Sequence, residues 1–110
     1  MINLFQAEWC PFSAAVRERL TELGLDFVAR QVPAWPEQRT QLVDRFGTDS
    51  IPVLEVDGQV YSGTRAIMRF LDGFDVPAGA PDHRARYHEH ADAREKDATG
   101  RLLEKAAPVS

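Results

Sequence analysis

The residue with the clearest chemical potential in this sequence is its single cysteine, Cys10. It lies between an alternating apolar and polar segment at 2–6 and Pro11, which suits the first turn of a helix because its missing N–H needs no partner there. A thiolate at a helix start faces unpaired backbone N–H groups and the positive end of the helix dipole, and both favour the charged, nucleophilic form. Ser13 is spaced to donate a hydrogen bond to the sulfur. The pattern therefore predicts a reactive thiol.

A lone cysteine also restricts the chemistry. It excludes an intramolecular disulfide and a zinc site of the multi-cysteine type. With no signal peptide visible at the N-terminus, it favours a reducing, cytoplasmic location. The alternative interpretation of Cys10 is a small buried hydrophobic residue, which is a common role for free cysteines.

The elements that position Cys10 are predicted from apolar spacing and from glycine and proline signals. Apolar residues at helical spacing follow Pro11, and Asp57-Gly58 is a strong signal for a two-residue hairpin. Pro52 indicates an edge strand, unless it lies at the start of its strand in a special conformation. The predicted order is β-α-β-α-β-β-α, with strands at 2–6, 25–32, 51–56 and 59–61 and helices at 11–23, 37–46 and 66–71.

The composition changes after the first 74 residues or so. We expect residues 1–74 to form the domain, and 75–110 to form a linker and a solvated helical tail that contributes little to the core. Acid-to-base pairs four residues apart favour that helix, while the tail holds few apolar side chains. The pairs are Asp82/Arg86, Asp92/Lys96 and Asp97/Arg101, the apolar residues are Tyr87, Leu102 and Leu103, and the linker residues are Pro77, Gly79 and Pro81.

Charge and hydropathy exclude several classes of partner. Lys and Arg number 13 against 17 Asp and Glu, so the net charge is −4, whereas nucleic acid binding needs a basic patch. No apolar run approaches the roughly 18 residues of a membrane span. His83, His88 and His90 have no cysteine or carboxylate that completes a ligand set, so we expect no metal.

Three short motifs resemble those of the glutaredoxins, a family with the thioredoxin fold. Residues 9–13, Trp-Cys-Pro-Phe-Ser, are similar to the family's Trp-Cys-Pro-Tyr-Cys, with serine in place of the second cysteine. Residues 51–53, Ile-Pro-Val, resemble a Val-Pro pair whose proline is cis and lies against the active cysteine. Residues 61–67 resemble both the glycine-led turn of glutaredoxins and the Glu-Ser-Arg-Ala-Ile segment of the glutathione S-transferase N-terminal domain. The resemblance covers roughly residues 1–74 and implies an α/β thioredoxin-like fold with a four-stranded mixed sheet.

The same resemblance implies that Cys10 is the nucleophile. Ser13 would assist the thiolate but cannot act as a second disulfide arm. The residues expected to line the thiol cleft are Trp9, Pro11 and Phe12, with Pro52 against the cysteine.

The resemblance also implies contacts to glutathione. Gln38 would hold the glycine carboxylate, and the backbone of Ile51 would pair with the cysteinyl unit. Gly63 and Thr64 would present a backbone N–H and a hydroxyl to the γ-glutamyl carboxylate, at a helix start where an anion is favoured. Taken alone, Thr64 is more typical of an ordinary helix N-cap.

Charged positions depart from the glutaredoxin pattern. Ala7 stands where the family usually has lysine, and Arg65 where an aspartate holds the γ-glutamyl ammonium. A transferase would have glutamate or glutamine in place of Gly63. The expected co-substrate is therefore glutathione or another low-molecular-weight thiol, with Arg39 or Arg65 available to recruit an acidic one.

The function implied is a monothiol, glutaredoxin-like thiol–disulfide oxidoreductase acting on mixed disulfides, for which one protein cysteine is enough. One alternative is a non-catalytic carrier of glutathione and an iron–sulfur cluster, although cluster-binding relatives have glycine where this chain has Pro11. Another is a stand-alone transferase N-terminal-like domain, although transferases hold their electrophile in a large helical second domain. The expected partners are small thiols and mixed disulfides, without nucleic acid or membrane.

Overall fold

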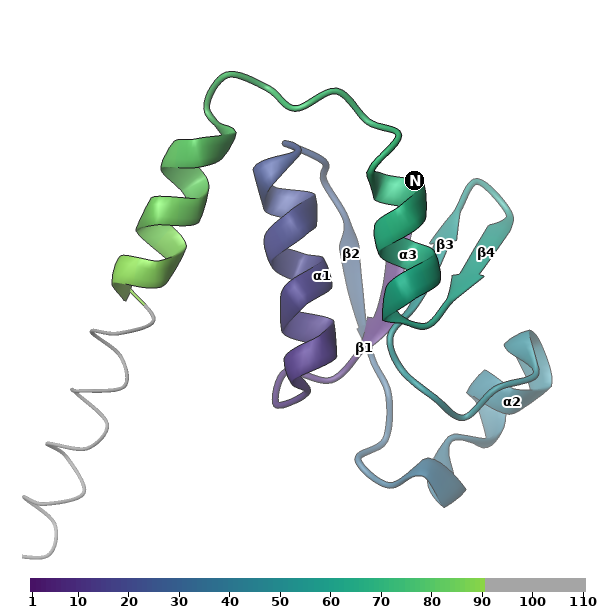
Figure 1. Cartoon of the computed structure of the whole chain (residues 1–110). Coiled ribbons are helices and arrows are strands. Elements are labelled where there is room, and N and C mark those ends of the chain that lie inside the picture. Colours follow the sequence, from purple (N-terminus) through teal and green to yellow (C-terminus); the bar gives the residue numbers. More distant parts are fainter. Residues whose placement is uncertain (91–110) are drawn as a thin grey trace, which may run out of the picture.

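The computed structural model describes residues 1–90, which form a four-stranded mixed sheet with helices on both faces (Figure 1). The strand order is β2-β1-β3-β4; β1 runs parallel to β2 and antiparallel to β3, which pairs antiparallel with β4. This is the α/β thioredoxin-like fold, and the predicted order of elements is confirmed. The elements are β1 (Ile2–Gln6), α1 (Pro11–Glu22), β2 (Val28–Gln31), the 3-10 turn η1 (Pro36–Gln38), α2 (Thr40–Phe46), β3 (Val53–Val56), β4 (Gln59–Ser62) and α3 (Thr64–Leu71).

The core lies between the sheet and the two helices α1 and α3, which lie side by side over one face (Figure 1). The opposite face carries α2, where the Phe46 ring contacts Phe5 edge-on at 4.9 Å between centroids. Successive residues of β1 therefore face opposite sides of the sheet, with Leu4 in the main core and Phe5 against α2. The fully buried residues of the main core are Leu4, Val16, Leu20, Leu54, Ile67 and Leu71.

Two elements differ most from the bounds that the sequence predicted. The strand expected at 25–32 pairs only over Val28–Gln31, an exposed edge strand, because Leu25 and Phe27 pack against the core before the pairing begins. The helix expected at 37–46 is divided by Arg39, whose ψ of 49° interrupts the helical backbone between η1 and α2.

Pro52 does not mark an edge strand, contrary to the first reading of the sequence. β3 lies inside the sheet, between β1 and β4. Pairing starts at Val53, one residue after the proline, so no ladder hydrogen bond is lost. The Ile51–Pro52 peptide bond is cis, as the resemblance implied. Pro52 therefore directly precedes its strand and has a cis peptide bond, which is the case in which a proline need not indicate an edge strand.

Residues 80–90 are helical and lie on the outer side of α1 (Figure 1). Residues 81–90 are exposed, as expected of a solvated tail, but Ala80 is buried and Arg84 contacts the domain. Arg86 pairs with Glu89 at 3.1 Å, whereas the expected pair with Asp82 is not formed. The other two expected pairs, together with Leu102 and Leu103, lie outside the described residues.

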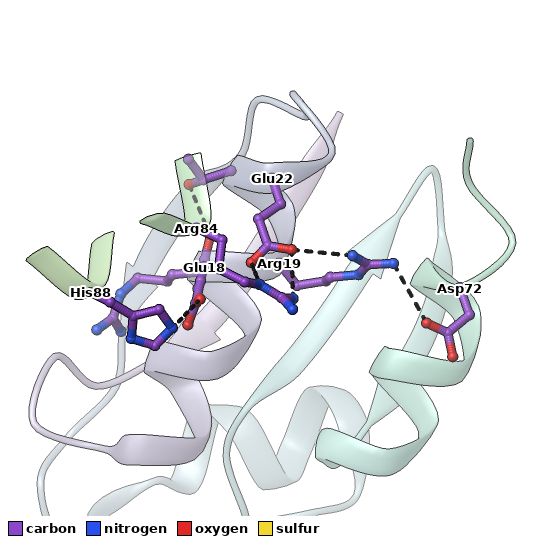
Figure 2. A network of polar contacts seen from close by, with 8 residues as sticks. Glu18, Arg19, Glu22, Asp72, Arg84 and His88 are labelled. Carbon is purple, nitrogen blue, oxygen red and sulfur yellow. Dashed lines mark hydrogen bonds and ion pairs between the residues drawn. The ribbon is translucent and has the colours of Figure 1, made fainter. Parts of the chain in front are cut away.

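The contact of Arg84 with Glu22 is the strongest link between this helix and α1. Both carboxylate oxygens of Glu22 accept from Arg84, each at 2.8 Å, and Figure 2 shows this carboxylate between Arg84 and Arg19. Glu22 is only 3% exposed, and the hydrogen bonds from Arg84 lower its pKa more than burial raises it. The helix at 80–90 is thus anchored to the domain, which the sequence did not predict.

None of the helices in residues 1–90 combines the length and the apolar character that crossing a membrane requires.

Candidate functional site

Cys10 occupies the N-cap of α1, with extended backbone angles of φ −78° and ψ 121°. Pro11 follows as the first helical residue. The Cys10 carbonyl accepts the first helical hydrogen bond from Ala14 at 3.0 Å, and the Cys10 N–H donates to the Ala7 carbonyl at 3.2 Å. The tight turn from β1 into α1 therefore holds the cysteine at the end of the helix where backbone N–H groups are unpaired.

The surroundings of Cys10 favour the thiolate. Burial raises the pKa of the thiol, but hydrogen bonds from the backbone and side chain of Ser13 and from the backbone of Phe12 lower it, as does the positive charge of Arg39. The net effect is a pKa below the ordinary cysteine value. Because the thiolate is the nucleophilic form, this environment suits reaction rather than a purely packing role.

The Ser13 hydroxyl is held in position by the backbone. It is fully buried and accepts a hydrogen bond from the Ala7 N–H at 3.4 Å. Since that contact uses an oxygen lone pair, the hydroxyl proton remains free to be donated to the sulfur. Ser13 can therefore orient and stabilise a thiolate at Cys10.

Aromatic side chains border the buried cysteine. Cys10 is 5% exposed as a whole residue, whereas Trp9 and Phe12 are 64% and 59% exposed. Pro11 is exposed between Cys10 and Phe12. The residues expected to line the thiol cleft are therefore exposed, whereas Cys10 itself is buried.

The cis-proline loop is linked directly to the start of α3. The Gly63 N–H donates to the Pro52 carbonyl at 3.0 Å. Gly63 therefore cannot offer its N–H to a ligand, and the first unpaired N–H groups at this helix start belong to Thr64 and Arg65.

Thr64 is not the helix N-cap. Gly63 is the N-cap of α3, and no side chain makes a capping hydrogen bond there. Thr64 is the first helical residue and lines a shallow depression of about 360 Å³. Its other lining residues are Ser62, Gly63, Arg65, Ala66 and Arg69.

Gln38 and Ile51 lie on two different loops. Gln38 ends η1 and borders a cavity of about 440 Å³ between α2 and the sheet, together with Phe5 and Phe46. Ile51 is half-buried and immediately precedes cis-Pro52. Cys10 lines neither of the two cavities, so the described geometry does not unite all the expected site residues in one hollow.

Arg39 is a residue of the site whose position the sequence did not indicate. It is 5% exposed, and its guanidinium donates to the carbonyls of Pro33, Ala34 and Asp49 at 2.8, 2.9 and 2.8 Å. A guanidinium buried in this way is not available to recruit an acidic thiol, so that expectation for Arg39 is wrong. Because every residue has a backbone carbonyl, nothing in the sequence indicated which three carbonyls Arg39 would bind. Arg65, by contrast, is exposed at the start of α3.

The histidines form no metal site within residues 1–90, where no group of three or more potential ligands lies together. His88 Nε2 is 3.7 Å from a Glu18 oxygen, as Figure 2 shows. His83 borders a cleft between α1 and the helix at 80–90, along with Phe27 and Tyr87.

The sheet topology and the cysteine at the N-cap of the first helix define a domain of the thioredoxin-like class. Residues 9–73 match the family described as "Glutathione S-transferase, N-terminal domain". The chain belongs to this family. A comparison with curated protein sequences found no match.

Solved structures with the same fold come from several organisms. A glutathione S-transferase domain-containing protein of Marinobacter aquaeolei is 29% identical, with a TM-score of 0.59, and the alignment covers 69% of this chain and 40% of that one. Rice GST1, solved in complex with glutathione, is 26% identical with a TM-score of 0.59, over 86% of this chain and 47% of the rice protein. A trimeric glutathione transferase of Leishmania is 24% identical, with a TM-score of 0.62, and the alignment covers 73% of this chain and 19% of that one. At this identity the similarity shows the fold alone. The chain spans less than half of each of these relatives.

Proposed function

We propose that the chain is a glutathione-dependent, monothiol thiol–disulfide oxidoreductase with Cys10 as its nucleophile. The observation that carries this proposal is the hydrogen-bonded position of Cys10 at the N-cap of α1, where its pKa is lowered despite burial. Ser13 one turn later leaves no second thiol within the chain, so a small thiol must complete the reaction.

The proposed reaction consists of two exchanges. In the first, the Cys10 thiolate attacks the glutathione sulfur of a mixed disulfide, the S–S bond breaks, and the other thiol leaves as a thiolate that takes a proton from water. In the second, the thiolate of a free glutathione attacks the glutathione sulfur now bonded to Cys10. Glutathione disulfide leaves and the Cys10 thiolate is regenerated, so one mixed disulfide and one free glutathione give one free substrate thiol and one glutathione disulfide.

The residues proposed to bind glutathione come from three segments further along the chain than Cys10. The backbone of Ile51 would pair with the cysteinyl unit, and Gln38 would hold the glycine carboxylate. The unpaired N–H groups of Thr64 and Arg65 would hold the γ-glutamyl carboxylate, since the Gly63 N–H is already used by Pro52. The glutathione in the structure of rice GST1 supports this choice of ligand, because that protein has the same fold and 26% identity.

A second candidate is the transfer of glutathione to an electrophile. It is favoured by the family match over residues 9–73. The two solved relatives are each more than twice as long as the part of them that aligns with this chain. A site for the electrophile would lie in that additional length. The two candidates differ in the role of Cys10, which must form a disulfide in the first and need not react in the second.

The test follows the loss of a mixed disulfide between glutathione and 2-mercaptoethanol, with free glutathione added. We expect wild-type protein to accelerate the exchange and Cys10→Ser to be inactive while its circular dichroism is unchanged. Mass spectrometry should detect a glutathione adduct on Cys10. If the wild type and Cys10→Ser are equally inactive in exchange, and both conjugate glutathione to 1-chloro-2,4-dinitrobenzene, the transferase candidate replaces the proposal.

A further inference from the structure

Arg39 joins two loops that are far apart in the sequence, one after β2 and one before cis-Pro52. From its position between η1 and α2, its Nε and Nη2 donate to the carbonyls of Pro33 and Ala34, in the loop after β2. Its Nη1 donates to the carbonyl of Asp49, in the loop before cis-Pro52. The three hydrogen bonds are short, at 2.8 to 2.9 Å, and come from one planar group.

Two of the residues proposed to bind glutathione lie close in sequence to these contacts, Gln38 at the end of η1 and Ile51 before cis-Pro52. Gln38 directly precedes Arg39, and Ile51 is two residues beyond Asp49. Because the guanidinium is planar, hydrogen bonds to both loops fix their separation as well as their contact. A side chain that cannot make these bonds would leave the three carbonyls without this partner and the loops free to separate.

Arg39 also provides positive charge to Cys10. Glutaredoxin-like proteins usually have a lysine three residues before the cysteine, but here that position is Ala7, which is 3% exposed. The other charged groups near this turn are Glu8 and Arg17, which neutralise each other at 3.1 Å. The Arg39 guanidinium, by contrast, has no carboxylate within ion-pair distance among residues 1–90, so its charge is not cancelled locally and lowers the pKa of the thiol.

We propose that Arg39 is the positioning residue of this site, fastening the cis-proline loop to the loop before α2 and supplying the cation for the Cys10 thiolate. It acts on glutathione only through the loops and does not touch it. The part concerning glutathione rests on the proposed function, whereas the part concerning the thiol does not.

Two variants separate the charge from the loop contacts. Arg39→Met removes both, and Arg39→Lys keeps a cation but cannot bridge three carbonyls in one plane. Alkylation of Cys10 by iodoacetamide is measured against pH without glutathione. We expect Arg39→Met to shift the midpoint upward and slow alkylation at pH 7 by about threefold or more, while Arg39→Lys stays near wild type.

Steady-state exchange with glutathione then reports on the loops. Both variants should raise the KM for glutathione severalfold, including Arg39→Lys, whose thiol reactivity is retained. The matched control is Arg86, an exposed arginine of the helix at 80–90 that pairs with Glu89 at 3.1 Å. Arg86→Met and Arg86→Lys should change neither the alkylation profile nor the KM.

Each outcome decides part of the proposal. If folded Arg39→Met keeps the wild-type alkylation midpoint, the charge role is overturned, and if Arg39→Lys keeps the wild-type KM, the loop role is overturned. If Arg39→Met does not fold, Arg39→Lys alone decides the loop role, and its alkylation profile at raised salt decides the charge role. A wild type that ignores glutathione altogether contradicts the proposed function, while the alkylation profiles still decide whether Arg39 acts on Cys10.

Discussion

The backbone N–H of Gly63 donates a hydrogen bond to the carbonyl of Pro52 at 3.0 Å. This contact joins the cis-proline loop to the N-terminus of α3, two parts of the proposed glutathione site. Gly63 makes it with φ 88° and ψ 151°, a backbone conformation that is accessible almost only to glycine.

Gly63→Ala should therefore destabilise the protein through its backbone alone. An added Cβ would meet no atom within 4 Å, so no steric clash with neighbours contributes, and the expected loss is about 1–3 kcal/mol of unfolding free energy. Urea unfolding measures it. Gly79→Ala is the control, because Gly79 also has open space but no positive φ, and it should change stability by less than about 0.5 kcal/mol. Equal effects of the two substitutions would show that the Gly63 conformation is not costly.

Ser13→Ala should make Cys10 less reactive near neutral pH. It removes one of the hydrogen bonds that hold the thiol pKa below its ordinary value, so the midpoint of alkylation should rise and the rate at pH 7 should fall severalfold. Alkylation rates across pH measure this directly. Ser50→Ala, at an exposed serine, should leave the profile unchanged. A wild-type midpoint at the ordinary cysteine value would support a packing role for Cys10.

Ser13→Cys should give the protein a second disulfide arm. The two sulfurs would be one helical turn apart, at the N-cap and third residue of α1, which allows an intramolecular disulfide to release a bound protein substrate. Reduction of a protein disulfide should then become measurable without added small thiol. The double variant Cys10→Ser with Ser13→Cys should lack this activity, and its presence there would assign the nucleophile to position 13.

Stability should fall as Glu22 becomes protonated. Arg84 lowers the folded-state pKa of Glu22 below its unfolded value, so this contribution is complete above the unfolded value of about 4.5 and is lost as pH falls through the folded pKa. Glu18 acts in the opposite direction, since burial and the Glu22 charge raise its pKa and its protonation favours the fold. The Tm measured from pH 7 to pH 3 should fall less for Glu22→Gln than for wild type.

The anchoring of the tail can be tested on the same network. Arg84→Ala leaves the buried Glu22 with Arg19 as its remaining partner at 3.2 Å, so its Tm at pH 7 should fall more than that of Arg86→Ala. Arg86 is the matched control, because it lies in the same helix and pairs only with exposed Glu89. Truncation after Phe74 should likewise lower the Tm. A truncated protein as stable as the full chain would restore the expectation from sequence that the tail contributes little.

The sequence by itself determined the features that depend on neighbouring residues. Pro11 after Cys10 specifies a helix start, because proline lacks the N–H that the first turn does not need. Asp57-Gly58 specifies the β3–β4 hairpin, since both residues adopt the positive φ values of 49° and 86° that its turn requires. The apolar spacing likewise predicted the order of elements, and the resemblance of residues 51–53 to the glutaredoxin motif implied the cis bond before Pro52.

Only the tertiary structure decided which groups remain free to act. Arg39 is bound by three carbonyls, Gly63 has its N–H taken by Pro52, and Glu22 is neutralised by Arg84, 62 residues further along the chain. The backbone groups in these contacts are common to all residues, and the ion pair joins segments whose spacing follows no local period. A sequence pattern therefore indicates Cys10 as the candidate nucleophile, but the charge and the hydrogen bonds around it depend on how distant loops meet when the chain folds.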